Sequence, residues 1–329
     1  MTVIDLSRKL VTNARRMTAD GRGILAADES IATMSTRLEA ASIPASDTSR
    51  RDYRELLLTA PGLSTSVSGV IWCDETFGQQ LSDGSDFPDA ALRRDILPGI
   101  KVDTGTVPLQ GGNGALVTQG LDGLDERLGA YAERGAAFAK WRAVFDVDTI
   151  TEESARTNAR SLARYASLCQ QHGLVPIVEP EVLAQGEHDM VDSARATKLA
   201  LRTLFEELQT ADVDLSGIVL KPNFVTPGLD HPKVSAKSVA SVTFDVLRQT
   251  VPTAVTGIAF LSGGHSTEKA CAYLAELNAI EGMPWAMTFS FGRALVSDAL
   301  TTWGGSAGEH DRAQRALTKN CERAAAAVR

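Results

Sequence analysis

The 329-residue sequence has few of the features that mark membrane, secreted or nucleic-acid-binding proteins. No apolar run approaches the ~18 residues that a membrane-spanning helix needs. The four cysteines are scattered and form no CxxC pair, which argues against a disulfide framework and favours a reducing compartment. The formal net charge of -8 argues against a general nucleic-acid binder. We therefore expect a cytoplasmic protein that has neither a membrane nor a nucleic acid as its partner.

Histidine is also scarce, with five residues in the whole chain. None of them forms an HxH motif or an i, i+4 pair, the spacings that commonly bind zinc. We expect neither a catalytic metal nor another cofactor.

The segment from Met1 to Met17 has no apolar core of the kind found in signal peptides. Its three arginines permit an alternative interpretation as a transit peptide. Its apolar residues follow one face of a helix, which favours an N-terminal helix; they are Val3, Leu6, Leu10 and Met17.

Eight strand-like segments alternate with helix-like segments along the chain. The expected strands are Arg22–Glu29, Val67–Thr76, Gly99–Thr104, Ala136–Val147, Val175–Val182, Gly217–Val225, Ala254–Gly263 and Trp285–Arg293. This repeated alternation predicts the α/β class and a single (β/α)8 barrel domain over residues 1–329. The alternative is a doubly wound sheet, but its glycine-rich turn should follow the first strand, and here Gly21 and Gly23 lie at or before it.

Four long helices are predicted by apolar periodicity, and two of them by a capping residue as well. They are Glu152–His172 after Thr151, Met190–Leu208, Ala236–Gln249 and Thr267–Asn278 after Ser266. We expect a further helix over Asp311–Arg329 at the C-terminus. The longest irregular piece is Gly105–Gly120, and loops of that length are often functional.

Ionisable residues lie at the C-terminal end of seven of the eight expected strands. They are Asp28, Glu29, Asp74, Glu75, Lys101, Asp103, Lys140, Arg142, Glu179, Glu181, Lys221 and Arg293. A barrel carries its chemistry at that end of its strands. Since buried charge costs several kcal/mol unless it is paired, we interpret the repetition as a site, with a structural salt-bridge network as the alternative.

Side-chain alternation along strands sharpens this prediction. Lys140 and Arg142 are two residues apart and share a face, as do Glu179 and Glu181. We expect one cavity to receive Lys101, Lys140, Arg142 and Lys221 together with Asp28, Glu179 and Glu181.

Lys221 ends a short buried strand and is followed by Pro222. It could be an ordinary lysine that extends its amine to water. In a cavity with other charged groups it is instead typical of a Schiff-base nucleophile. The neighbouring carboxylates could transfer protons.

Two glycine-containing strand ends are candidates for phosphate binding. Ser262, Gly263 and Gly264 close the seventh strand and precede a helix, whose N-terminus offers free N–H groups. Ser290, Gly292 and Arg293 close the eighth, and barrels frequently bind phosphate after these two strands. Arg37, on the helix after the first strand, could contact a second phosphate.

Seven motifs, in order, resemble those of the class I fructose-bisphosphate aldolases. They are GRGILAADES, GIKVDTGTVPL, FAKWR, VPIVEPEVL, VLKPNFVTPG, FLSGGHS and FSFGRAL. The likeness runs from about Gly21 to Ala316. It implies a metal-independent (β/α)8 enzyme, homotetrameric in this family, that reversibly cleaves fructose 1,6-bisphosphate to dihydroxyacetone phosphate and glyceraldehyde 3-phosphate in glycolysis and gluconeogenesis.

The resemblance also implies residue roles. Lys221 would form the Schiff base, Glu179 would be the acid and base of its formation with Glu181 beside it, and Asp28 would serve carbon–carbon cleavage. Lys140 would hold charge near the substrate's C4 hydroxyl, supported by Arg142 and Lys101. Ser262, Gly263 and Arg293 would bind the C1 phosphate, and Arg37 the C6 phosphate.

The sequence departs from the family pattern at four places. Thr33 replaces a phosphate-contacting serine, Thr36 replaces the lysine before Arg37, and Phe291 replaces a tyrosine. The family's tail ending in tyrosine, which assists proton exchange on the enamine, is absent from the sequence. These changes leave open a preference for a monophosphate or a related sugar phosphate. A non-catalytic scaffold is a further alternative, against which the intact set of Lys221, Glu179, Asp28 and Lys140 argues.

Overall fold

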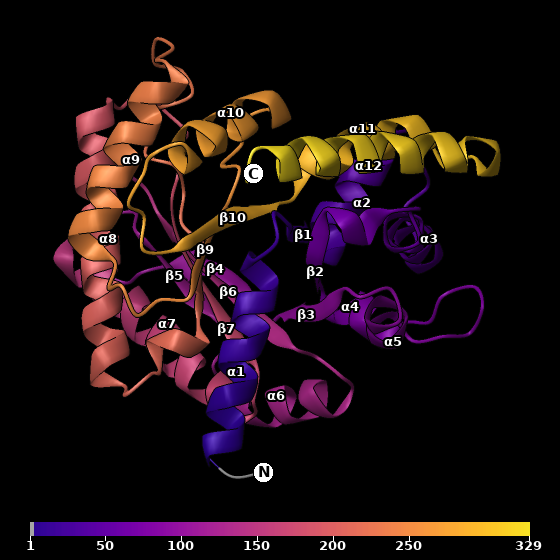
Figure 1. Ribbon diagram of the computed structural model, residues 1–329, viewed down its shortest axis with the longest axis horizontal. Helices are drawn as coiled ribbons and strands as arrows, with labels where there is room; N and C mark the ends of the chain where they lie inside the picture. The colour runs from indigo at the N-terminus through magenta and orange to yellow at the C-terminus, as the bar shows by residue number, and fades with distance from the viewer. Residues whose placement is uncertain (1–2) are drawn as a thin grey trace.

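The computed structural model describes residues 3–329. Eight parallel strands close into a barrel in the order β1-β10-β9-β8-β7-β6-β3-β2, and helices surround it (Figure 1). The strands are β1 (Gly23–Ala27), β2 (Val67–Trp72), β3 (Leu97–Lys101), β6 (Phe138–Phe145), β7 (Val175–Val182), β8 (Val219–Leu220), β9 (Gly257–Phe260) and β10 (Ala286–Phe291). The predicted (β/α)8 barrel is confirmed.

The helices of the outer layer agree with the predicted alternation. They are α2 (Ile31–Ala40), α3 (Asp47–Leu58), α4 (Asp74–Gly78), α5 (Phe87–Leu92), α6 (Leu124–Glu133), α7 (Glu152–Gln171), α8 (Met190–Thr210), α9 (Ala236–Thr250), α10 (Thr267–Asn278), α11 (Arg293–Trp303) and α12 (His310–Ala326). Short 3-10 turns are η1 (Leu63–Thr65), η2 (Leu215–Gly217) and η3 (Ala307–Glu309). The predicted N-caps are confirmed, because Thr151 accepts from Ser154 N and Ser266 from Lys269 N. Over residues 3–329, no helix has the length and apolar character to cross a membrane.

Helix α1 (Val3–Thr18) covers the amino-terminal mouth of the barrel. Leu10, Ala14 and Met17 are buried in one cluster with inward-facing strand residues such as Ile24 and Phe138. The predicted apolar face is therefore confirmed for Leu10 and Met17, while Leu6 is half-buried. Met1, Thr2 and the side chain of Val3 lie outside the described residues.

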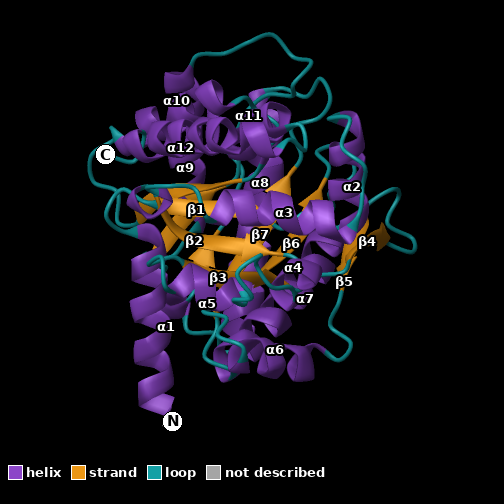
Figure 2. Ribbon diagram, turned by 90° about the vertical axis from the view of Figure 1, so that its right-hand side faces the viewer, coloured by secondary structure: helices purple, strands orange, loops and turns teal. Residues whose placement is uncertain are grey.

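The prediction of an irregular segment over Gly105–Gly120 is wrong. The segment contains an antiparallel hairpin of β4 (Gly105–Pro108) and β5 (Leu116–Gln119), a separate sheet from the barrel. The side chain of Asn158 on α7 ties β5 down, donating to Leu116 O and accepting from Thr118 N. Figure 2 shows the hairpin and α1 at opposite ends of the barrel, so the hairpin stands at the carboxyl ends of the strands.

Seven of the eight expected strands end earlier than predicted, and the sixth and the second differ most from their expected bounds. The sixth is reduced to Val219 and Leu220, because Gly217 belongs to η2 and Pro222 has no N–H for a further ladder bond. The second ends at Trp72, after which Asp74 and Glu75 begin the short helix α4. These two carboxylates therefore point outward, as described below.

The barrel interior is filled by alternate residues of each strand. Phe138 on β6 supplies the largest inward ring, and a Cβ at Gly99 on the neighbouring β3 would lie 2.1 Å from it. Glycine at this position is thus required by close approach of the ring. All four cysteines are buried and unpaired within the described residues.

Candidate active site

The inward face of the strands changes from apolar to charged toward their carboxyl ends. On β6 the inward residues are Phe138, then Lys140, then Arg142, and the neighbouring β7 presents Ile177 and then Glu179. Register places Arg142 directly opposite Glu179. The apolar residues fill the barrel core. The charged residues lie beyond it, toward the carboxyl ends of the strands, and share one space.

That space is a cavity of about 440 Å³ at the carboxyl end of the barrel. It is lined by all fifteen residues predicted for the site: Asp28, Thr33, Arg37, Lys101, Lys140, Arg142, Glu179, Glu181, Lys221, Ser262, Gly263, Gly264, Ser290, Gly292 and Arg293. Further lining residues include Glu29, Ser30, Asp103, Gly105 and Thr106, which sequence reasoning did not assign to a ligand. The sequence does indicate Glu29 and Asp103 as candidates, since both are charged residues at strand ends.

Four ionisable groups form a row across the floor of the cavity, three of them buried and Asp28 partly buried. Lys221 Nζ lies 3.0 Å from Glu179 Oε1, and Lys140 Nζ lies 3.3 Å from Glu179 Oε2. The second contact is an ion pair without hydrogen-bond geometry. Lys140 Nζ also lies 2.6 Å from Asp28 Oδ2. Lys140, Glu179 and Lys221 are each 3% exposed, so amines and carboxylates alternate in a place from which water is largely excluded.

The two amines hold the two carboxyl groups ionised. Burial by itself would raise the pKa of Asp28, but the charges of Lys140 and Lys221 outweigh it and hold that pKa well below its usual range. The pKa of Glu179 is also lowered against the effect of burial, by Lys140, Lys221 and Arg142. Conversely, Asp28 and Glu179 raise the pKa of Lys140 although burial opposes this. Lys140 is thus a permanent cation between two carboxylates.

The segment after β8 is fixed by Asn223. Its Oδ1 accepts from Val182 N at the end of β7, and its Nδ2 donates to Phe224 O and Thr197 Oγ1. Lys221 itself donates its backbone N–H to Val178 O, 2.8 Å away. These contacts fix the backbone beneath Lys221, a role that the sequence did not reveal because the partners come from other elements.

Three further ion pairs complete the walls. Arg142 Nε pairs with Glu181, Lys101 Nζ lies 2.6 Å from Asp103 Oδ1, and Arg37 pairs with Glu29. Burial would lower the pKa of Arg142, but Glu181 and Glu179 raise it. Each cation therefore has a carboxylate that orients it.

The phosphate-type loops differ from these walls because their polar groups are free. Gly263 and Gly264 have φ of 56° and 85°, a left-handed conformation that glycine adopts without strain. Ser290 Oγ is buried without a hydrogen-bond partner in the described part of the chain, and Arg293 takes part in no ion pair there. A Cβ on Gly264 would lie 3.8 Å from Arg293, so loop and guanidinium adjoin. Unpaired donors beside a helix N-terminus suit an anion.

Two residues predicted at strand ends do not join the cavity. Asp74 accepts from Tyr131 Oη at 2.6 Å, and burial together with this bond raises the pKa of Tyr131 to about 12. Glu75 pairs with Arg50 of α3. Both carboxylates serve the packing of helices, because α4 turns them away from the barrel axis. No group of three or more metal-ligating side chains occurs among residues 3–329.

Comparison with known proteins assigns the family. The family model described as fructose-bisphosphate aldolase class-I matches residues 9–329. The chain belongs to the class-I fructose-bisphosphate aldolase family. Members of this family are carbon–carbon lyases that work without a metal ion.

Individual aldolases match over nearly the whole chain. Cytosolic fructose-bisphosphate aldolase 5 of Arabidopsis thaliana is 44% identical, covering 95% of this chain and 88% of the relative. Fructose-bisphosphate aldolase 2 of Caenorhabditis elegans is 46% identical over 92% of this chain and 84% of its own length. A solved structure of the aldolase from Plasmodium falciparum superposes with a TM-score of 0.96 at 42% identity, covering 98% of this chain and 95% of that chain.

Proposed function

We propose that this aldolase reversibly cleaves fructose 1,6-bisphosphate to dihydroxyacetone phosphate and glyceraldehyde 3-phosphate through a Schiff base at Lys221. The observation that carries the proposal is the row of Lys221, Glu179, Lys140 and Asp28, joined by contacts of 3.0, 3.3 and 2.6 Å. It supplies a nucleophilic amine and two bases side by side, which are the groups that imine chemistry requires.

Schiff-base formation would use the contact between Lys221 and Glu179. The lowered pKa of Glu179 keeps it a carboxylate in the free enzyme. In that form it can accept the proton that Lys221 must give up before it attacks. The neutral amine then attacks the C2 carbonyl to give a carbinolamine. Glu179, now a carboxylic acid, returns the proton to the departing hydroxyl, so that water leaves and a protonated imine forms.

Carbon–carbon cleavage would use Asp28 and Lys140. Asp28 is ionised and accepts the proton of the C4 hydroxyl, while Lys140 stabilises the charge that develops on that oxygen. The electron pair of the C3–C4 bond moves into the iminium group to form an enamine, and glyceraldehyde 3-phosphate leaves. Protonation of the enamine and hydrolysis of the imine by water release dihydroxyacetone phosphate and restore the amine.

The two phosphates would occupy opposite ends of the substrate. We assign the C1 phosphate to Ser262, Gly263, Gly264 and Arg293, with Ser290 beneath them, and the C6 phosphate to Arg37 and Thr33. The free donors of the first group support its assignment. Arg37 is paired with Glu29 and thus offers a weaker field to a second phosphate. Comparing kcat/KM for the bisphosphate and for fructose 1-phosphate measures how much the second group contributes.

The test is reductive trapping. Borohydride with dihydroxyacetone phosphate should leave a covalent adduct that peptide mass mapping places on Lys221, and EDTA should leave turnover intact. Lys221→Ala should form no adduct and lose cleavage. Lys101→Met is the matched control, since it removes another lysine of the same cavity and should still be trapped. An adduct on a different lysine, or activity lost to EDTA, would overturn the proposal.

Membership of the aldolase family also suggests the domain organisation, assembly and location of the protein. We propose that the chain folds as one barrel domain, assembles as a homotetramer and acts in the cytoplasm in glycolysis and gluconeogenesis. The cytosolic relatives and the single closed barrel support this. Light scattering should give four times the protomer mass, and calorimetry should show one unfolding transition. A dimer or two separate transitions would contradict it.

A further inference from the structure

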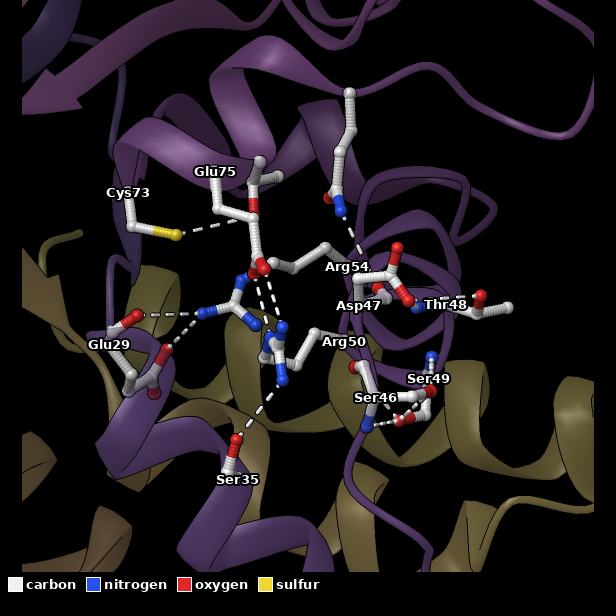
Figure 3. Close-up of polar contacts among 12 residues, drawn as sticks. Glu29, Ser35, Ser46, Asp47, Thr48, Ser49, Arg50, Arg54, Cys73 and Glu75 are labelled. Carbon is white, nitrogen blue, oxygen red and sulfur yellow. Dashed lines mark hydrogen bonds and ion pairs between the residues drawn. The ribbon is translucent and has the colours of Figure 1, made fainter.

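A buried arginine outside the cavity contacts the backbone on both sides of Asp28. Arg54 of α3 is 0% exposed and donates from Nε to Ala27 O at 3.1 Å and from Nη2 to Glu29 O at 3.1 Å. Nη2 also lies 3.3 Å from Glu29 Oε2. The guanidinium group therefore bridges the two carbonyl groups that flank Asp28 at the end of β1 (Figure 3 shows its contacts with Glu29).

Packing alone does not explain an arginine at this position. Burying a guanidinium group costs more free energy than burying an apolar side chain of similar volume, unless its bonds repay the desolvation. Nη1 of Arg54 is buried without a hydrogen-bond partner in the described part of the chain, so that desolvation is not fully offset. The donors that are satisfied, Nε and Nη2, are those directed at the end of β1.

The backbone that Arg54 holds determines where the carboxylate of Asp28 lies. Asp28 follows Ala27, the last residue of β1, so it lies where the ladder between β1 and β2 ends. Its Oδ2 must nevertheless stay 2.6 Å from Lys140 Nζ on β6. The planar guanidinium group of an arginine can direct two donors at both neighbouring carbonyl groups, whereas the ammonium group of a lysine acts as a single point charge.

We propose that Arg54 is a positioning residue for cleavage: by fixing the carbonyl groups of Ala27 and Glu29 it holds Asp28 against Lys140. The inference rests on the proposed role of Asp28 in breaking the C3–C4 bond. Arg54 touches neither the substrate nor the reacting atoms and acts only through the end of β1.

Helix α3 provides a matched control on the same face. Arg50 lies one turn earlier, is 9% exposed, and binds Glu75 through Nε at 2.8 Å and Ser35 through Nη1 at 3.1 Å (Figure 3). It is a buried arginine in the same helix but contacts α4 and α2 rather than β1. A second control is Glu29→Gln, which removes the ion pair with Arg54 but keeps both carbonyl contacts.

The experiment compares cleavage with Schiff-base formation in the full-length enzyme. In Arg54→Met we expect kcat for the bisphosphate to fall by about 10²-fold, the loss that an ~1 Å misplacement of a reacting group can cause. Trapping of dihydroxyacetone phosphate on Lys221 should remain, since the pair of Lys221 and Glu179 is untouched. The acid limb of the kcat profile should move to higher pH, because a displaced Asp28 loses the stabilising charge of Lys140.

The controls separate positioning from general damage. Arg50→Met should keep kcat within about twofold, and any effect of Glu29→Gln should fall on KM, since its other oxygen pairs with Arg37. If Arg54→Met does not fold, Arg54→Lys tests the inference in its place. We expect this variant to lose about tenfold in kcat while its thermal midpoint of unfolding stays unchanged.

Two results would overturn the inference: an unchanged kcat in the folded Arg54 variants, or equal loss of cleavage and of trapping. Failure of the wild-type enzyme to be trapped would instead reject the Schiff-base mechanism itself.

Discussion

Replacing Lys140 with methionine tests whether one buried cation holds the site together. The side chain of Lys140 is 4% exposed and lies between Asp28 and Glu179, whose side chains are 14% and 5% exposed. Two unit charges about 4 Å apart attract by about 4 kcal/mol at an effective dielectric constant of about 20. Removing one partner of a buried pair typically costs about 3–5 kcal/mol, because the other charge stays buried. We expect Lys140→Met to lower the free energy of unfolding by that amount at about pH 7.

The loss of unfolding free energy in Lys140→Met should become smaller as the pH falls. In the wild type the pKa of Asp28 lies below its ordinary value of 3.8, so its contribution is complete above that value and is lost as the pH falls through the lowered pKa. Without Lys140, burial dominates and the carboxyl pKa moves upward, so the variant regains stability as it takes up protons. The difference between the two proteins should therefore narrow as the pH falls from about 7 to about 4.

Urea unfolding at fixed protomer concentration measures both quantities, since assembly would otherwise shift the midpoint. Arg202→Met is the control, because Arg202 pairs with Glu152 at the surface, where the side chains are 53% and 62% exposed. We expect that variant to lose at most about 1 kcal/mol, with little change with pH. A loss in Lys140→Met below about 1 kcal/mol, or one that is independent of pH, would refute the electrostatic account.

Further predictions concern three single positions. Ser290→Ala removes a buried hydroxyl that lacks a partner, so stability should stay within about 1 kcal/mol while KM for the bisphosphate rises; a large loss of stability with an unchanged KM would contradict a role in binding. Gly228→Ala places a Cβ 2.0 Å from Gly186 O and should cost about 1–3 kcal/mol in thermal unfolding. Gly129→Ala, inside α6 with 3.4 Å to its nearest neighbour, should instead gain up to about 1 kcal/mol, and an equal effect of both changes would argue against the steric explanation.

Much of the fold could be predicted because local signals and tertiary contacts agree. The strand Val175–Val182 has the predicted bounds, and Thr151 and Ser266 cap helices where their side chains can accept from the first turn. The inward position of Lys140 and Glu179 follows from strand alternation, which depends only on the backbone. Sequence periodicity therefore predicted which side chains share the cavity, as its lining confirms.

The errors have physical causes that the sequence does not display. The hairpin strands Gly105–Pro108 and Leu116–Gln119 have four residues each, too few for a clear period, and glycines surround them. A charged residue at a strand end can point into the barrel or away from it. Glu75 points toward Arg50 because helix α4 begins there.

The arginines of α3 contact β1 and α4 across 27 and 25 residues of sequence, so no local pattern could indicate these partners. The residues that line the cavity could therefore be predicted from the sequence, whereas the residues that hold them in place could not.

The hairpin beside the cavity has a consequence for how this enzyme could diversify. Its strand β5 is attached to α7 through Asn158, while Gly105 and Thr106 of β4 face the ligand space. Neither strand belongs to the barrel sheet that carries the reacting lysine. Substitutions in β4 can thus reshape one wall of the pocket without disturbing the strands beneath it. Laboratory evolution toward new aldehyde acceptors would therefore vary β4 and keep β5, whose Thr118 donates to Arg142 O of the barrel.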